Sequence, residues 1–215
     1  MAYIFQGSDA APDLYDQSLA LRHEVFDRQL QWDVTSQDGR EYDDFDTDDT
    51  FYTALTVSSA AANTPAFFNR ERVIGTWRML PTTGPYMLSE IFADPLGCAV
   101  PRQSDVWEMS RLAADPSVPR GAAYSTAIPA ALFHAALIFA ADFGLTGILV
   151  VHDRPMARLT RLLLGYGASW QSDTVMVGRC RTSAAIYRTC DPTAFARRHG
   201  LEDRVRYLER VRRAA

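Results

Sequence analysis

Acidic side chains crowd residues 41–49, which read EYDDFDTDD. Clustered carboxylates suit hard cations such as Ca²⁺, and they also suit ion pairs with arginine. A calcium loop beginning at Asp44 would put Asp49 where the sharp turn needs glycine and Leu55 where a bidentate glutamate is required, so the calcium interpretation fails. The remaining choices are a solvated acidic loop or a set of partners for buried arginines. The aromatic residues interleaved with the acids favour the second choice.

Three arginines of the chain are expected to need carboxylate partners. Arg22, Arg78 and Arg111 stand in apolar stretches of the chain. Burying a charged group is costly unless an opposite charge pairs with it. We therefore expect carboxylates of the acidic segment to hold these guanidinium groups.

A second group of residues that could take part in chemistry lies in the segment 107–113, WEMSRLA. Strand alternation would send Glu108 and Ser110 to one face, and Met109 and Arg111 to the other. In a central strand covered on both sides, ionisable groups are either paired in a salt-bridge network or placed at a cleft. Both possibilities remain open for Glu108 and Arg111.

Several familiar mechanisms are excluded by residue type. All 22 basic residues are arginine, so Schiff-base amines, lysine bases and the lysine of a P-loop are missing. There is no G-x-S-x-G nucleophile elbow, and His23-Glu24 is followed by Asp27 where H-E-x-x-H needs histidine. The four histidines are scattered, and His134 in an apolar helix fits a core position, so no metal site is expected.

These residues must be positioned by a mixture of strands and helices. Periodicity and β-branched content predict helices at 13–28, 122–143, 156–164 (closed by Gly165) and 192–212. They predict strands at 3–5, 51–57, 73–80, 106–113, 147–151, 174–177 and 184–187. The segment 58–65, SSAAANTP, is expected to be a hairpin loop between two strands.

The order of elements predicts the fold class. A strand at 106–113, a long apolar helix and a strand at 147–151 make a βαβ unit with two adjacent parallel strands. Helices before and after it indicate an α/β protein, a three-layer α/β/α sandwich with a mixed central sheet. A length of 215 residues is enough for one sizeable core, so we expect a single domain over residues 1–215.

Composition and charge narrow the class of protein, the compartment and the partners that are expected. The hydrophobic fraction of 47% and charged fraction of 22% are those of a globular protein. Three cysteines leave one unpaired, and residues 1–13 lack the basic, apolar start of an export signal, so we expect a cytoplasmic protein. The apolar stretch at 127–141, about 15 residues long, is too short to cross a bilayer. Net charge is −4, and nucleic acid is not an expected partner.

Taken together, the motifs resemble one family, the acyl-homoserine-lactone synthases of LuxI type, which make bacterial quorum-sensing signals. The resemblance covers most of the first two thirds of the chain, and no match is evident beyond Thr174. Its parts are Leu21-Arg22-x-x-Val25-Phe26, Trp32, Glu41-x-Asp43-x-x-Asp46, Arg78 in Gly75-Thr76-Trp77-Arg78, Phe92, and Glu108-x-Ser110-Arg111.

The resemblance implies an enzyme that joins S-adenosylmethionine to an acyl thioester carried by acyl carrier protein or coenzyme A. It implies a fold similar to GCN5-type N-acetyltransferases, in which two parallel strands splay apart. The coenzyme A loop [QR]-x-x-G-x-[GA] of those enzymes is not matched at 115–121, DPSVPRG, which weighs against an ordinary acetyltransferase. No cofactor is expected, because S-adenosylmethionine is a substrate.

Residue roles follow from the same resemblance. Glu108 is the candidate base for the substrate α-amine, whose unperturbed pKa of about 7.7 to 8.0 makes deprotonation easy. Asp43 and Asp46 would hold Arg111 and Arg78 or bind the amine. The residues expected at S-adenosylmethionine are Arg22, Phe26, Trp32, Arg78 and Phe92.

Part of that assignment has an alternative. Phe26 and Trp32 would belong to an N-terminal lid whose rings face the sulfonium, or they simply staple a helix to the sheet. Arg22 suits either an acidic residue or the substrate carboxylate.

Met79 and Val150 are expected in the acyl pocket, between the 147–151 strand and the 122–143 helix. Valine at position 150 lacks the hydroxyl that often accompanies 3-oxoacyl preference in the family, so an unsubstituted acyl group is expected. The basic tail, with Arg197, Arg198, Arg204 and Arg206, either docks an acidic carrier protein or is a solvated helix face.

Two rival functions remain. One keeps the fold and makes acyl-amino acids without closing a lactone ring. The other is a non-catalytic protein that binds acyl ligands or their carrier as a regulator, which the Glu108, Arg111 and acidic pattern disfavours.

Overall fold

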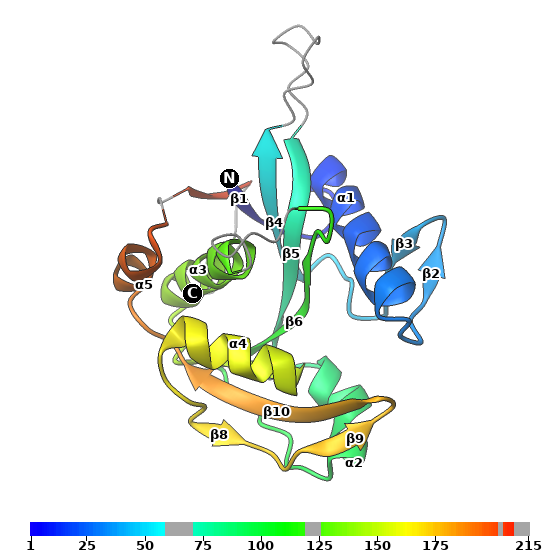
Figure 1. The fold of residues 1–215 in the computed structure, drawn as a ribbon, viewed down its shortest axis with the longest axis vertical. Helices are drawn as coiled ribbons and strands as arrows, with labels where there is room; N and C mark the ends of the chain where they lie inside the picture. The colour runs from blue at the N-terminus through cyan, green and yellow to red at the C-terminus, as the bar shows by residue number, and fades with distance from the viewer. Residues whose placement is uncertain (59–70, 119–125, 202–203, 209–215) are drawn as a thin grey trace, which may run out of the picture. The chain divides into compact units, whose positions relative to one another are not determined.

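A computed structural model describes residues 1–58, 71–118, 126–201 and 204–208. Figure 1 shows the helices and strands of the chain. Their packing divides the chain into two compact units. Unit 1 comprises residues 1–78, 111–135 and 202–212, and unit 2 comprises residues 79–110, 136–201 and 213–215. Strands β5 (Glu71–Pro81) and β6 (Val106–Ala114) and helix α3 (Ala127–Asp142) contribute residues to both units.

The sheet of unit 1 has the strand order β11-β1-β4-β5-β6. Strand β1 (Ala2–Gln6) runs antiparallel to β4 (Phe51–Ser58) and parallel to β11 (Val205–Tyr207). The predicted strands in this unit are confirmed to within a few residues. The expected hairpin loop at 58–65 lies almost wholly outside the described residues.

Helix α1 (Pro12–Arg22) begins with proline in its first turn, where a missing N–H costs nothing. It continues into a π-helix, η1 (His23–Gln29), so the single helix expected at 13–28 is two kinds of helix. The core of unit 1 combines Leu21 and Phe26 from these helices with Phe5 and Tyr52 from the sheet. This packing fixes the helix that carries Arg22.

Glycine explains how α3 approaches the sheet in unit 1. A Cβ at Gly75 of β5 would lie 3.0 Å from side-chain atoms of both Ile128 and Leu132 of α3. The Trp77 indole N–H donates to the Leu132 carbonyl at 2.9 Å. Because strand side chains alternate, Gly75 and Trp77 face the helix while Arg78 points to the other side of β5.

A short hairpin precedes the acidic segment. Strands β2 (Ser36–Gln37) and β3 (Arg40–Glu41) pair antiparallel around Asp38 and Gly39, whose φ angles are 51° and 73°. An Asp-Gly pair with two positive φ angles is the usual two-residue hairpin turn. This hairpin is not among the elements predicted from the sequence, although it sets the position of Glu41.

The sheet of unit 2 has the order β5-β6-β7-β10-β8, with β9 also paired to β10. Strand β7 (Gly147–Asp153) lies parallel to β6 over three pairs, from Val106 with Gly147 to Glu108 with Leu149. The predicted βαβ unit and the mixed α/β sheet are therefore confirmed. Strand β10 (Cys180–Arg188) runs antiparallel to β7, and β8 (Trp170–Gln171) and β9 (Val175–Val177) lie along it.

The helices of unit 2 are η3 (Leu88–Phe92), α2 (Ala93–Leu96), α4 (Arg154–Leu164) and α5 (Pro192–His199). Both α4 and α5 start with an aspartate N-cap and a proline, and they end at Gly165 and Gly200 in the left-handed conformation. The prediction of one helix over 192–212 is wrong, because Gly200 stops α5 and the chain resumes as strand β11. Among the described residues, no helix has the length and apolar character needed to span a membrane.

Candidate active site

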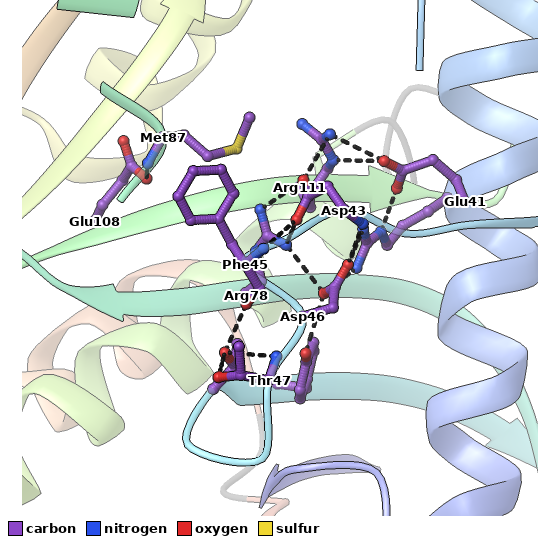
Figure 2. Close-up of polar contacts among 12 residues, drawn as sticks. Glu41, Asp43, Phe45, Asp46, Thr47, Arg78, Met87, Glu108 and Arg111 are labelled. Atoms are coloured by element: carbon purple, nitrogen blue, oxygen red, sulfur yellow. Dashed lines mark hydrogen bonds and ion pairs between the residues drawn. The ribbon is translucent and has the colours of Figure 1, made fainter. Parts of the chain in front are cut away.

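Three carboxylates and three guanidinium groups form one network in unit 1, which we call the acid–arginine network (Figure 2). Its members are Glu41, Asp43, Asp46, Arg22, Arg78 and Arg111. Because the charges balance three against three, the network can be buried without a net charge. The expectation that the acidic segment holds the buried arginines agrees with this geometry.

Arg22 of α1 occupies one end of the network. Its Nε donates to Glu41 at 2.5 Å, and its two terminal nitrogens each donate to Asp46 at 2.8 Å. The side chain is 2% exposed. Burial alone would lower the pKa of Arg22, but hydrogen bonds and charges from Asp46 and Glu41 raise it above its ordinary value. Of the two roles expected for Arg22, pairing with acidic residues is the one these contacts display.

Arg78 of β5 lies at the centre. It donates to both oxygens of Asp43 at 2.5 and 3.0 Å, and it lies 2.9 Å from Asp46. Its guanidinium group also stands over the ring of Phe45, 5.5 Å from the centroid. Burial would lower the pKa of Arg78, and the two aspartates raise it. Phe45 therefore covers a buried cation, which explains why an aromatic residue sits among the acids.

Asp46 joins two of the arginines to the sheet. It accepts hydrogen bonds from both terminal nitrogens of Arg22, from the Tyr52 hydroxyl at 3.0 Å and from the Asp43 backbone N–H at 2.9 Å. Burial would raise the pKa of Asp46, but Arg22 and Arg78 hold it below its ordinary value. Burial, followed by the charge of Asp46, raises the pKa of Tyr52. Asp46 is thus an ionised structural link.

Arg111 and Asp43 form the more accessible end of the network. Arg111 reaches Glu41 at 2.9 Å and Asp43 at 2.8 Å, and its guanidinium group lies 5.6 Å from the centroid of Phe26. Side-chain exposure is 11% for Arg111 and 16% for Asp43, against 2% or less for the other four members. A small ligand reaching the network in unit 1 would meet these two groups first.

The backbone of Arg111 departs from the sequence expectation. Its φ angle is 53°, a left-handed conformation that is uncommon and strained for a residue with a side chain. This conformation interrupts the pleat of β6, so the strict alternation predicted through Arg111 is wrong at that residue. The strain is held in place by the ion pairs to Glu41 and Asp43.

Phe26 and Trp32 stack with their ring centroids 5.2 Å apart. Phe26 is 3% exposed and belongs to the core of unit 1, whereas Trp32 is 43% exposed. The pair therefore combines a packing residue with a ring available to a ligand. Both interpretations, a lid and a hydrophobic staple, remain compatible with these contacts.

Glu108 is found in unit 2 and is 1% exposed. Its two carboxylate oxygens accept hydrogen bonds from the backbone N–H groups of Met87 and Leu88, both at 2.9 Å. Figure 2 shows Glu108 beside Met87. These groups belong to the start of η3, where unpaired N–H groups and the helix dipole favour a negative charge. Burial and then the charge of Glu108 raise the pKa of Tyr86 to about 12. The arrangement suits an ionised glutamate.

The other predicted site residues in unit 2 lie on separate elements. Phe92 is the half-buried last residue of η3, Met79 is buried in β5, and Val150 is buried in β7. Val150 pairs with Ala185 of β10. Their predicted contacts with substrate remain predictions.

One member of the acid–arginine network, Glu41, and one residue that contacts the network, Tyr52, were not among the predicted site residues. Glu41 stands in the family motif without an assigned role, and Tyr52 was predicted only as part of a strand. The spacing Glu41-x-Asp43-x-x-Asp46 contained the signal for Glu41. Tyr52 gave no local signal, because its hydroxyl reaches Asp46 only after β4 is in the sheet.

Comparison with known proteins first gives the structural class. The CoA-dependent acyl-homoserine lactone synthase BjaI, solved with SAM and isopentyl-CoA, matches with a TM-score of 0.76 at 24% identity, covering 96% of this chain and 92% of that chain. A protein from Lactobacillus plantarum assigned as an N-acetyltransferase matches with a TM-score of 0.57 at 16% identity, covering 88% of this chain and 98% of that chain. The fold is therefore the one shared by acyl-homoserine-lactone synthases and N-acetyltransferases.

The sequence then gives the family. A family model described as autoinducer synthase matches residues 9–194. The acyl-homoserine-lactone synthase of Aliivibrio fischeri is 35% identical over 148 residues, which is 68% of this chain and 71% of that protein. The chain belongs to the autoinducer synthase family, and the match extends past Thr174, where the motif resemblance ended.

Proposed function

We propose that this chain synthesises an N-acyl-L-homoserine lactone from S-adenosylmethionine and an acyl thioester, releasing methylthioadenosine. The observation that carries the proposal is that Arg22, Asp43, Asp46, Arg78 and Arg111, which define the family resemblance, form one buried, charge-balanced network. Such a network is expensive to assemble. Its accessible end, Asp43 and Arg111, suits the α-amine and α-carboxylate of an amino acid substrate.

The acylation step needs no protein nucleophile. The neutral α-amine attacks the thioester carbonyl, a C–N bond forms, and the C–S bond breaks, so the carrier leaves as a thiolate that finally takes up the proton given up by the amine. We propose Glu108 as the base that receives the amine proton, directly or through a water molecule. The two N–H donors from Met87 and Leu88 keep its carboxylate ionised and oriented.

Ring closure follows from the substrate itself. The α-carboxylate attacks the γ-carbon, a C–O bond forms, and the bond from that carbon to the sulfonium breaks, which releases methylthioadenosine. The protein contributes orientation of the carboxylate, and we propose Arg111 for that task. Trp32 offers an exposed aromatic face to the sulfonium.

The acyl donor is either coenzyme A or acyl carrier protein in this proposal. Met79 and Val150 are proposed to contact the acyl chain, and the lack of a hydroxyl at Val150 favours an unsubstituted acyl group. Both substrates are products of cytoplasmic metabolism, which supports a cytoplasmic enzyme.

The test is turnover by the purified chain. S-adenosylmethionine is supplied with unsubstituted and 3-oxo acyl groups on coenzyme A and on acyl carrier protein, and products are identified by mass spectrometry. We expect acyl-homoserine lactone and methylthioadenosine in equal amounts. Acyl-amino acid without methylthioadenosine would replace this function with an N-acyltransferase, and the absence of any product from a folded enzyme across the panel would refute it.

A further inference from the structure

A polar cavity of about 200 Å³ lies within unit 2, apart from the residues discussed so far. Helix α4 supplies Arg154, Ala157 and Arg161, β8 supplies Gln171, and β10 supplies Ser183 and Tyr187. Figure 1 shows α4 lying beside β10. Almost every lining side chain carries a hydrogen-bond donor, and two carry a permanent positive charge. The composition is that of a site for a negatively charged group.

The spacing of side chains along α4 and β10 accounts for the cavity. Residues 154, 157 and 161 of α4 fall on one helix face, and the small Ala157 between the two arginines leaves room. On β10, Ser183 and Tyr187 lie on one face of the strand. The cavity is therefore lined by two solvent-exposed arginines from α4 and by two hydroxyl groups from β10.

The positive charge of this cavity is not matched by acids. Within the described ranges, no carboxylate lies at ion-pair distance from Arg154 or Arg161. The charge of Arg161 is felt by buried groups nearby. Burial lowers the pKa of His152, the neighbouring Asp153 raises it, and Arg161 lowers it by a smaller effect, while burial raises the pKa of Tyr187 against the opposing effect of Arg161.

A buried polar group beside the cavity is only half satisfied. His152 is 5% exposed, and its Nε2 lies 3.1 Å from the Tyr187 hydroxyl. Its Nδ1 is buried and has no hydrogen-bond partner in the described structure. When the His152 Nε2–H donates to the Tyr187 hydroxyl, that hydroxyl keeps its own proton, which it can donate to an oxyanion in the cavity. Nδ1 is then an acceptor, so it would not pair with the oxyanion.

We propose that this cavity binds an oxyanion group, a carboxylate or a phosphate, carried by the acyl donor. Naming the acyl donor rests on the proposed function, whereas the anion site itself does not. The cavity lies next to the position proposed for the acyl group. Val150 pairs with Ala185, and the next pair on the same face of the two strands is His152 with Ser183, which lines the cavity. A cavity of this size and polarity suits a charged terminus and not an alkyl chain.

Two kinds of variant test the site. Arg154→Ala combined with Arg161→Ala removes its charge, and Ala157→Leu fills its space while keeping both arginines. Arg158→Ala is the matched control, because Arg158 is an exposed arginine of the same helix that does not line the cavity. All four proteins, including the wild type, are compared by circular dichroism and thermal unfolding before use.

Binding is measured by calorimetry on the full chain with five probes: inorganic phosphate, glutarate, coenzyme A, octanoyl-coenzyme A and glutaryl-coenzyme A. We expect the double variant and Ala157→Leu to weaken binding of at least one coenzyme A compound by about tenfold, with Arg158→Ala close to wild type. Equal losses for all three coenzyme A compounds identify a phosphate as the bound group. A loss confined to glutaryl-coenzyme A identifies a carboxylate on the acyl chain.

Unchanged affinity for every probe in both variants overturns the proposal. Losses confined to inorganic phosphate or glutarate overturn the assignment to the acyl donor. Because these measurements need no turnover, failure to make a lactone would refute the proposed function and leave the binding result standing.

Discussion

The Glu108 carboxylate accepts hydrogen bonds from two backbone N–H groups, so a substitution at this position can change both folding and turnover. Replacement by glutamine keeps the shape but leaves a single carbonyl oxygen for two donors. A residue that only positioned the start of η3 would then affect folding more than turnover, whereas a base would affect turnover most.

We expect Glu108→Gln to lower kcat by about 10² to 10⁴, the usual contribution of a general base. The same variant should lose about 1 to 3 kcal/mol of stability from the lost charged hydrogen bond. Turnover with both substrates and urea unfolding measure the two effects. The control is Glu90→Gln, a change at an exposed position of η3, the helix whose first N–H groups contact Glu108. Near-normal product formation would remove Glu108 as the base.

Asp46 is the network member whose loss should be felt most in stability. Asp46→Asn leaves Arg22 and Arg78 with a missing carboxylate in a buried site, and breaking a buried pair costs about 3 to 5 kcal/mol. Urea unfolding at neutral pH measures the loss. Asp48→Asn, an exposed change in the same segment, should leave the midpoint unchanged. An equal effect of the two changes would contradict the structural role of Asp46.

The same residue predicts acid sensitivity. The pKa of Asp46 is held below its ordinary value of 3.8 in the folded protein, so its stabilisation is fully present above that value and is lost as pH falls toward the folded pKa. Unfolding followed between pH 6 and pH 2.5 should therefore show a steeper decline for wild type than for Asp46→Asn. Parallel curves would show that Asp46 does not contribute.

At the scale of elements, the π-helix η1 and the residues after it bring Phe26 and Trp32 together. Phe26→Ala should cost about 3 to 5 kcal/mol, because its ring is in the core of unit 1. Trp32→Ala should change stability little and raise the KM for S-adenosylmethionine, because its exposed ring is free to meet the sulfonium. Thermal unfolding and initial rates separate the two. An unchanged KM for Trp32→Ala would favour the simple staple.

The helices and strands that were predicted differ from those that were not in how local their sequence signals are. The first strands, the βαβ unit and the glycine that closes α4 were predicted, because each is a local pattern of side chains. The last helix was extended through Gly200, although a glycine in that position is a normal helix end. Strand β11 had no strong local signal, and it exists because it pairs with β1, about two hundred residues earlier.

At the scale of the whole molecule, charge is uneven. Ten arginines and four acids lie between residues 179 and 213, in a chain whose net charge is −4. If this basic segment docks an acidic carrier protein, the KM for that donor should rise steeply with salt, while the KM for a coenzyme A donor should rise less. Arg197→Glu, an exposed change in α5, should reproduce the effect at low salt. Equal salt dependence for both donors would leave the segment a solvated surface.

The sequence by itself determined the types of residue available for chemistry. The absence of lysine excluded Schiff-base and P-loop chemistry. The spacing of Glu41, Asp43 and Asp46 and the order of the other motifs were sufficient to identify the family, because these are properties of the chain read one residue after another. The pattern also indicated that acids and arginines would pair.

The tertiary structure decided which acid meets which arginine. Arg22 comes from a helix, Arg78 from β5 and Arg111 from β6, so their shared carboxylates are settled only when the sheet and α1 are assembled. The left-handed φ angle at Arg111 and the two N–H donors at Glu108 are decided there too. The physical reason is that ion pairs and hydrogen bonds depend on distance in space, and separation along the chain does not encode it.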